Sequence, residues 1–81
     1  MKNIVWTKNE CIYCSMAKDF LKSKQIKFEE RNISTDWNKS QLLADLPNVK
    51  TLPQIILYDK HIGGYTELLK YSEDHGMWTN E

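Results

Sequence analysis

Two cysteines separated by two residues are the groups in this chain best suited to chemistry. They stand in the run Cys11-Ile12-Tyr13-Cys14, with Lys8 three residues earlier. Sulfurs at this spacing can bind a metal ion or form and exchange a disulfide. Zinc would need two further ligands, and the only histidines, His61 and His75, show no paired spacing. A structural disulfide across so short a loop would restrict the unfolded chain little, so the pattern favours thiol–disulfide exchange.

The segments on either side of the cysteine pair predict a strand and a helix that would position it. Residues 2–7 contain a short apolar run typical of a buried strand, and residues 13–24 repeat apolar side chains at helical spacing. The helical side chains expected to face inward are Met16, Ala17, Phe20 and Leu21. Cys11 would lie at or just before the helix N-terminus, where free backbone N–H groups and the helix dipole favour a thiolate over a thiol.

The next part of the chain predicts a second strand and a second helix. Residues 26–33 alternate apolar and polar side chains, which predicts a strand with one buried face. A helix joins this strand to the first, so we expect the two strands to pair in parallel with a right-handed crossover. Residues 34–36 supply N-cap candidates for a shorter helix that ends by Pro47. Its apolar side chains are Trp37, Leu42, Leu43 and Leu46.

The remaining elements predict a hairpin followed by a third helix. Residues 54–58 form the most apolar strand, residues 59–60 a compact turn, and residues 61–62 the stub of an antiparallel strand. Gly63 and Gly64 end it, and residues 65–75 form a helix that Thr66 can cap, with Leu68, Leu69 and Tyr71 partly inward. We therefore predict an α/β domain covering residues 1–81, with a four-stranded mixed sheet flanked by three helices.

Composition excludes several classes of partner. Eleven basic residues balance eleven acidic ones, so no overall field attracts nucleic acid or an anionic membrane. The longest apolar run, residues 55–58, is too short to cross a bilayer, and the N-terminus lacks the apolar core of a signal peptide. We expect a cytoplasmic monomer with locally recognised partners.

Three landmarks, in order, resemble the glutaredoxin family. They are the Cys11–Cys14 motif after Thr7-Lys8, the run Thr51-Leu52-Pro53 before a strand, and the run Gly63-Gly64-Tyr65-Thr66-Glu67-Leu68. The match covers essentially the whole chain and is closest to the small dithiol members of bacteria and phages. The resemblance implies a thioredoxin-like fold and a glutathione-dependent thiol–disulfide oxidoreductase. Its substrates would be glutathione mixed disulfides and disulfide-containing proteins, with ribonucleotide reductase as one candidate.

The resemblance also assigns roles to individual residues. Cys11 would be the nucleophile, with Lys8 stabilising its thiolate, and Cys14 the more buried resolving thiol. A cis bond between Leu52 and Pro53 would present the Leu52 backbone to a peptide-like substrate. The implied glutathione contacts are Lys8 and Tyr13 near the glycyl end, Thr51, Leu52 and Pro53 beside the cysteinyl part, and Gly64, Tyr65, Thr66 and Glu67 near the γ-glutamyl end.

The chain departs from the family pattern at three places. Ile12 replaces the usual proline between the cysteines, Thr66 and Glu67 replace the acidic residues common after the glycine pair, and a short tail carries Trp78, expected to cover the core. Loss of the proline resembles glutaredoxins that hold a [2Fe-2S] cluster between two copies through Cys11 and glutathione, although we expect no metal. The alternatives are therefore a redoxin reduced by thioredoxin reductase, an iron–sulfur carrier, and an interaction domain with a relic motif.

Overall fold

The first strand sends its side chains alternately into two buried apolar clusters. The computed structural model describes residues 2–75, so Trp78 lies outside the described residues. Strand β1 (Ile4–Thr7) directs Val5 into one buried cluster and Ile4 and Trp6 into another. Successive side chains of a strand point to opposite faces of a sheet, so the two clusters lie on opposite sides of β1.

The sheet has the strand order β2-β1-β3-β4. The remaining strands are β2 (Glu29–Asn32), β3 (Gln54–Leu57) and β4 (Lys60–Gly63). Strand β1 pairs in parallel with β2 and antiparallel with β3, and β3 pairs antiparallel with β4. The predicted four-stranded mixed sheet and its strand directions are confirmed.

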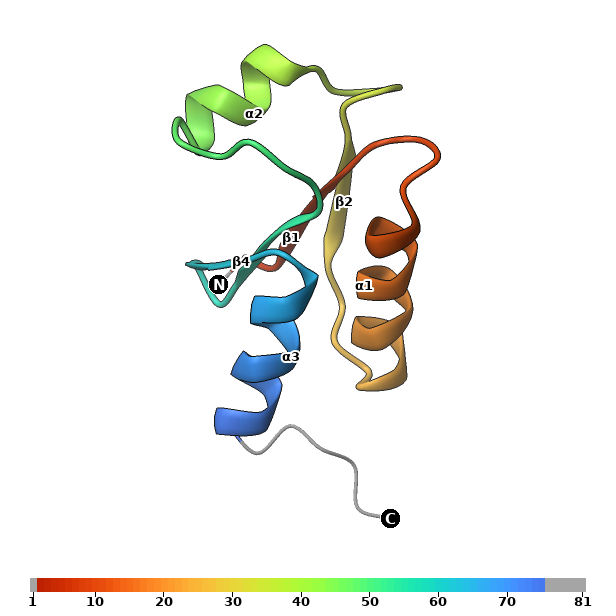
Figure 1. Ribbon diagram of the computed structural model, residues 1–81, viewed down its shortest axis with the longest axis vertical. Helices are drawn as coiled ribbons and strands as arrows, with labels where there is room; N and C mark the ends of the chain where they lie inside the picture. The colour runs from red at the N-terminus through yellow and green to blue at the C-terminus, as the bar shows by residue number, and fades with distance from the viewer. Residues whose placement is uncertain (1, 76–81) are drawn as a thin grey trace.

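Helices cover both faces of this sheet. Helices α1 (Ile12–Ser23) and α3 (Tyr65–Asp74) lie side by side (Figure 1) over the face that carries Val5. Helix α2 (Lys39–Asp45) lies apart from them and packs Leu42 against Ile4 and Trp6 on the other face. The predicted three helices are confirmed.

Arg31 joins β2 to the cluster beneath α2. Its guanidinium carbon lies 5.2 Å from the ring centre of Trp6 and 4.4 Å from that of Trp37. The same group forms ion pairs with Glu29 at 3.0 Å and with Asp45 of α2 at 3.1 Å. Only 12% of the Arg31 side chain is exposed, so both its stem and its charge contribute to fastening α2 to the sheet.

Two predictions for the first half of the chain are wrong. Met16 is 38% exposed, because the buried stripe of α1 consists of Cys14, Ala17 and Leu21, and Met16 lies about 200° around the helix from Cys14. The second strand begins at Glu29 instead of residue 26, because the Ile26 N–H still donates to the carbonyl of Leu21 at the end of α1.

Three predicted turns and caps are also wrong. Helix α2 is capped by Asn38, which exchanges hydrogen bonds with Gln41, instead of by residues 34–36. The hairpin turn is centred on Tyr58 and Asp59, whose φ angles of 54° and 68° suit a mirror-image turn, so β4 starts at Lys60. Gly64, not Thr66, is the N-cap of α3.

Candidate active site

The two cysteines occupy the predicted position at the start of α1. Cys11 is the N-cap residue, with extended φ and ψ of −121° and 106°, and the Cys14 N–H donates to Cys11 Sγ at 3.2 Å. The two sulfurs are joined in a disulfide, and their Cα atoms lie 5.2 Å apart. Cys11 is half-buried whereas Cys14 is 2% exposed, so an incoming sulfur reaches Cys11 first.

The loop before Cys11 is held by polar contacts that the sequence did not predict. Glu10 adopts a left-handed conformation with φ of 57°. The Asn9 N–H donates to Ser34 Oγ at 3.1 Å, and Asn32 Nδ2 donates to Asn9 Oδ1 at 3.1 Å. Ser34, predicted as a cap for α2, instead fixes the loop that delivers Cys11 to the helix end.

The peptide bond between Leu52 and Pro53 is cis, as predicted. The Leu52 carbonyl oxygen lies 3.9 Å from Cys11 Sγ. A disulfide sulfur carries no hydrogen, so this approach is a contact in the oxidised protein and a hydrogen bond is available only to the reduced thiol. The backbone just before Pro53 therefore faces the reactive sulfur.

Gln54 and His61 support this segment from beneath, and sequence reasoning missed them. Gln54 is 6% exposed, its Nε2 donates to the Thr51 carbonyl at 2.9 Å, and its Oε1 lies 2.8 Å from His61 Nε2. A carbonyl can only accept, so the amide nitrogen must face Thr51 and the His61 Nε2 must carry a hydrogen. The sequence did contain one indication of this role, because Gln54 is a polar residue at the start of the most apolar strand.

Replacing Gln54 with leucine should destabilise this loop. The Thr51 carbonyl would lose its donor, and we expect a loss of about 1–2 kcal/mol in the free energy of unfolding. We also expect a higher KM for the thiol reductant, measured in a turnover assay beside urea denaturation. His61→Ala is the matched control, because it removes only the outer hydrogen bond. Equal losses in both variants would contradict the role given to the Thr51 bond.

A hollow of about 340 Å³ brings together the predicted glutathione contacts other than Lys8. It lies between the cis-proline segment and the start of α3, and the rings of Tyr13 and Tyr65 approach with their centres 6.0 Å apart at its margin. Its lining consists of Tyr13, Thr51, Leu52, Pro53, Gly64, Tyr65, Thr66 and Glu67. Lys8 instead lines two neighbouring depressions, one of which also contains Cys11 and Cys14.

The N-terminus of α3 opens onto this hollow. The Gly64 N–H donates to Glu67 Oε1 at 2.8 Å, so one of the free donors at the helix start is already satisfied by an acidic side chain. Thr66 is exposed in the first turn. The remaining N–H groups and the positive end of the helix dipole suit a small carboxylate.

A buried threonine and a lysine hold the carboxylate of Glu30 on β2. Thr7 Oγ1 donates to Glu30 Oε2 at 2.7 Å, and Lys18 Nζ lies 3.0 Å from the same oxygen. Lys18 also lines the depression that contains Cys11 and Cys14. Partial burial alone would raise the pKa of Glu30, but the hydrogen bonds from Thr7 and Lys18, with the charges of Lys18 and Lys22, lower it below 4.5.

Replacing Glu30 with glutamine should reduce stability at neutral pH only. A carboxyl whose pKa is lowered by folding stabilises the protein fully above its unfolded pKa and loses that contribution as pH falls through the folded value. We expect a loss of up to about 1 kcal/mol at pH 7, because the pair is partly exposed. Urea denaturation at pH 7 and near pH 3 measures it, and an equal difference at both pH values would contradict the assignment.

Neither a metal site nor a membrane-spanning helix is found within residues 2–75. No group of three or more His, Cys, Asp or Glu side chains there could hold a metal ion. No helix in the same part of the chain is long and apolar enough to cross a membrane.

Comparison with known proteins identifies the family. The family model described as Glutaredoxin matches residues 3–62. The chain is 36% identical to Glutaredoxin 3 of Escherichia coli over 95% of its own length and 94% of that protein. The crystal structure of Glutaredoxin 1 from Francisella tularensis complexed with cacodylate superposes with a TM-score of 0.76 at 32% identity, covering 94% of this chain and 95% of that one.

A buckwheat glutaredoxin–glutathione complex, at 23% identity, shares the thioredoxin-like fold with a TM-score of 0.77, covering 93% of this chain and 71% of that one. The chain belongs to the glutaredoxin family and is a thiol–disulfide oxidoreductase with a redox-active Cys11–Cys14 pair.

Proposed function

We propose that the protein uses glutathione to reduce protein disulfides and glutathione mixed disulfides. The observation that carries this proposal is the hollow between the cis-proline segment and α3, because it lies beside Cys11 and offers a helix N-terminus to a carboxylate. Thr51 and Leu52 would pair with the cysteinyl backbone of glutathione. Gly64, Tyr65, Thr66 and Glu67 would surround its γ-glutamyl end, with Lys8 and Tyr13 at its glycyl end.

The reaction consists of thiol–disulfide exchanges that conserve electrons. The Cys11 thiolate attacks one sulfur of the target disulfide, the target S–S bond breaks, and its second sulfur leaves as a thiolate that takes up a proton. Cys14 loses its proton and attacks Cys11 Sγ, which forms the Cys11–Cys14 disulfide and releases the reduced target. One glutathione thiolate then opens this disulfide at Cys11, and a second removes the first as glutathione disulfide.

The groups around Cys11 stabilise its thiolate during this reaction. The Cys14 N–H, 3.2 Å from Cys11 Sγ, and the α1 dipole stabilise the attacking thiolate. Lys8 adds a positive charge at the same depression. With a glutathionylated substrate, Cys11 alone accepts the glutathionyl group and passes it to a second glutathione.

The cytoplasm, where glutathione keeps protein thiols reduced, is the compartment that suits this cycle. Ribonucleotide reductase is one candidate among protein substrates.

A coupled assay tests this function. The protein is incubated with bis(2-hydroxyethyl) disulfide and either glutathione with glutathione reductase or thioredoxin reductase alone, and NADPH consumption is followed. We expect turnover with glutathione only. Turnover supported by thioredoxin reductase alone would identify a thioredoxin-reductase-linked redoxin instead.

A glutathione-ligated [2Fe-2S] cluster between two copies is the second candidate. The observation in its favour is the exposed apolar surface beside Cys11, where Ile12 is 76% and Tyr13 60% exposed, because a second copy could cover it. Cys11 of each copy and two glutathione thiolates would hold the iron atoms. Anaerobic reconstitution with glutathione followed by visible absorption tests this, and a colourless monomer would contradict it.

A further inference from the structure

A second, larger groove lies on the other side of the cis-proline segment. It has a volume of about 470 Å³ and runs between α2 and residues 47–52. Thr51 and Leu52 line both this groove and the hollow assigned to glutathione, and Lys8 lines both it and the depression at the cysteines. The groove therefore adjoins the reactive site.

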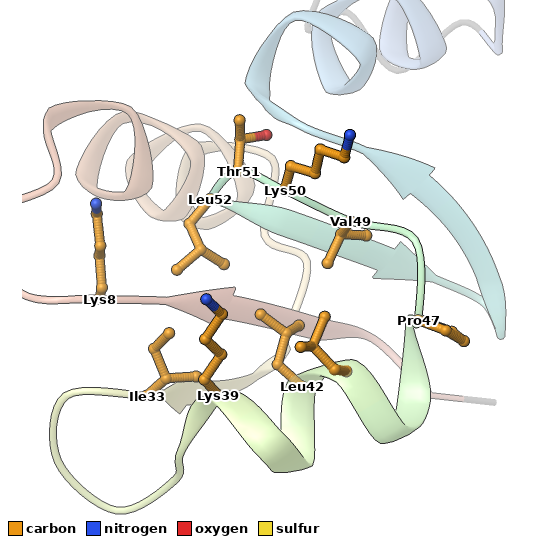
Figure 2. Close-up of a pocket in the computed structure, with 10 residues that line it drawn as sticks. Lys8, Ile33, Lys39, Leu42, Pro47, Val49, Lys50, Thr51 and Leu52 are labelled. Atoms are coloured by element: carbon orange, nitrogen blue, oxygen red, sulfur yellow. The ribbon is translucent and has the colours of Figure 1, made fainter.

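The walls of the groove are apolar. Figure 2 shows Leu42 of α2 facing Val49 and Leu52 of the opposite segment, with Ile33 at one end. Leu42 is buried, whereas Ile33, Val49 and Leu52 are only half-buried, so apolar surface remains accessible along the groove. A concave apolar strip of this kind is typical of a binding surface.

The margin of the groove is positively charged. Lys8, Lys39 and Lys50 line it, and none of its other lining residues within residues 2–75 is acidic. Figure 2 shows the Lys39 side chain pointing into the groove, whereas the Lys50 side chain extends from the rim of the opposite wall, away from α2. Within residues 2–75, none of these three lysines forms an ion pair. The chain as a whole has no net charge, so this unpaired local excess is a property of the groove and attracts carboxylates.

We propose that this groove binds the segment that follows the reacting cysteine of a protein substrate and selects apolar and acidic side chains there. The proposal rests on the proposed function, in which the cysteinyl part of glutathione pairs with Thr51 and Leu52 and its glycyl end lies near Lys8. Glutathione ends at that point, whereas a polypeptide continues into the groove. In an extended segment alternate side chains face opposite ways, so one set contacts the apolar wall and the other the lysines.

The lining favours a polypeptide over nucleic acid. Single-stranded nucleic acids are bound by basic grooves with aromatic side chains on which bases stack. Among the described residues, the groove is lined by aliphatic side chains, proline and threonine beside the lysines, and by no aromatic side chain. Carboxylates on an apolar peptide match both properties.

Competition for Cys11 tests the proposal directly. In the Cys14→Ser protein carrying glutathione on Cys11, a peptide thiolate attacks Cys11 Sγ, forms a Cys11–peptide disulfide and releases reduced glutathione, so the exchange constant compares peptide with glutathione. Two capped peptides are compared, acetyl-Ala-Cys-Ile-Glu-Val-Glu-amide and its counterpart with lysine in place of both glutamates. We expect the acidic peptide to be favoured about tenfold at low salt, with the preference reduced at high salt.

Charge reversal assigns the preference to the groove. Lys39→Glu with Lys50→Glu should abolish or invert it, whereas Lys27→Glu with Lys60→Glu, an equal change of charge on residues outside the groove, should leave it intact. Far-UV circular dichroism establishes that both double variants are folded. Equal exchange constants for the two peptides, or equal effects of the two double variants, would overturn the proposal. So would a concentration-dependent dimer that only the Lys39 and Lys50 changes disrupt, because it would assign the groove to a second copy.

The glutathione assay with the wild-type protein, run in parallel, separates a failure of peptide selection from a failure of glutathione-dependent activity. Turnover of bis(2-hydroxyethyl) disulfide with glutathione, together with no preference between the two peptides, would contradict only the proposal that the groove binds acidic peptides. Absence of turnover with glutathione would contradict the proposed glutathione-dependent function itself.

Discussion

We expect replacement of Cys11 with serine to reduce turnover of every disulfide substrate to the uncatalysed rate. A serine hydroxyl does not ionise near neutral pH at this site, so the α1 N-terminus and the Cys14 N–H would have no anion to stabilise. The buried Cys14, 2% exposed, cannot substitute for it as the attacking sulfur. The glutathione-coupled assay with bis(2-hydroxyethyl) disulfide measures the loss.

Cys14→Ser is the matched variant and should behave differently. It removes the resolving thiol but leaves Cys11 at the helix end, so transfer of a glutathionyl group between Cys11 and free glutathione remains available. We expect activity of the same order as wild type on a glutathionylated peptide and a large loss on an intramolecular protein disulfide. Equal losses on both substrates would contradict the division of roles between the two sulfurs.

Replacing Gly63 with alanine should have the largest effect on the fold around the site. Gly63 has φ of +121°, and an added Cβ would lie 3.0 Å from Cγ and 3.1 Å from Cβ of Glu67. Unfavourable φ and overpacking each cost about 1–3 kcal/mol, so we expect at least about 2 kcal/mol to be lost from the free energy of unfolding. Urea denaturation measures this loss, and glutathione turnover should fall with it because Glu67 is displaced.

Gly64→Ala separates backbone strain from crowding of the site. Its φ of −91° suits alanine, and the added Cβ would lie 3.2 Å from Glu67 Oε1 and 3.5 Å from the Pro53 carbonyl oxygen. We expect a stability loss below about 1 kcal/mol with a higher KM for glutathione, because the methyl group enters the hollow. A Gly63→Ala protein as stable as Gly64→Ala would contradict the strain argument.

Periodicity and connection length were sufficient to predict most of the fold. The continuous apolar run at residues 55–58 and the helical repeat after Cys14 located β3 and α1 to within a residue, because burial of apolar side chains dominates those segments. The parallel pairing of β1 and β2 followed from the helix between them. Positions set by local hydrogen bonds were missed, as with the Asn38 cap, which depends on its reciprocal bonds with Gln41.

In the candidate site, too, some features could be predicted from the sequence and others could not. The positions of Cys11, Cys14 and the cis Leu52–Pro53 bond could be anticipated from short motifs and the resemblance they carry. The contact of Gln54 with His61 could not, because it depends on which residues the β3–β4 hairpin brings together. The bond from Gln54 to the Thr51 carbonyl could not either, because it depends on the path of the loop before β3. The groove beside α2 combines residues far apart in the sequence, and no motif marks it.

The packing of Trp6, Arg31 and Trp37 gives the molecule an internal optical reporter. The two indole rings meet edge to face with their centres 5.4 Å apart, and Arg31 connects them to α2 through Asp45. Near-ultraviolet circular dichroism arises from aromatic rings held in fixed surroundings and is lost when side-chain packing loosens. The indole signal therefore follows the attachment of α2, and with it the shape of the groove, separately from the far-ultraviolet signal of the backbone.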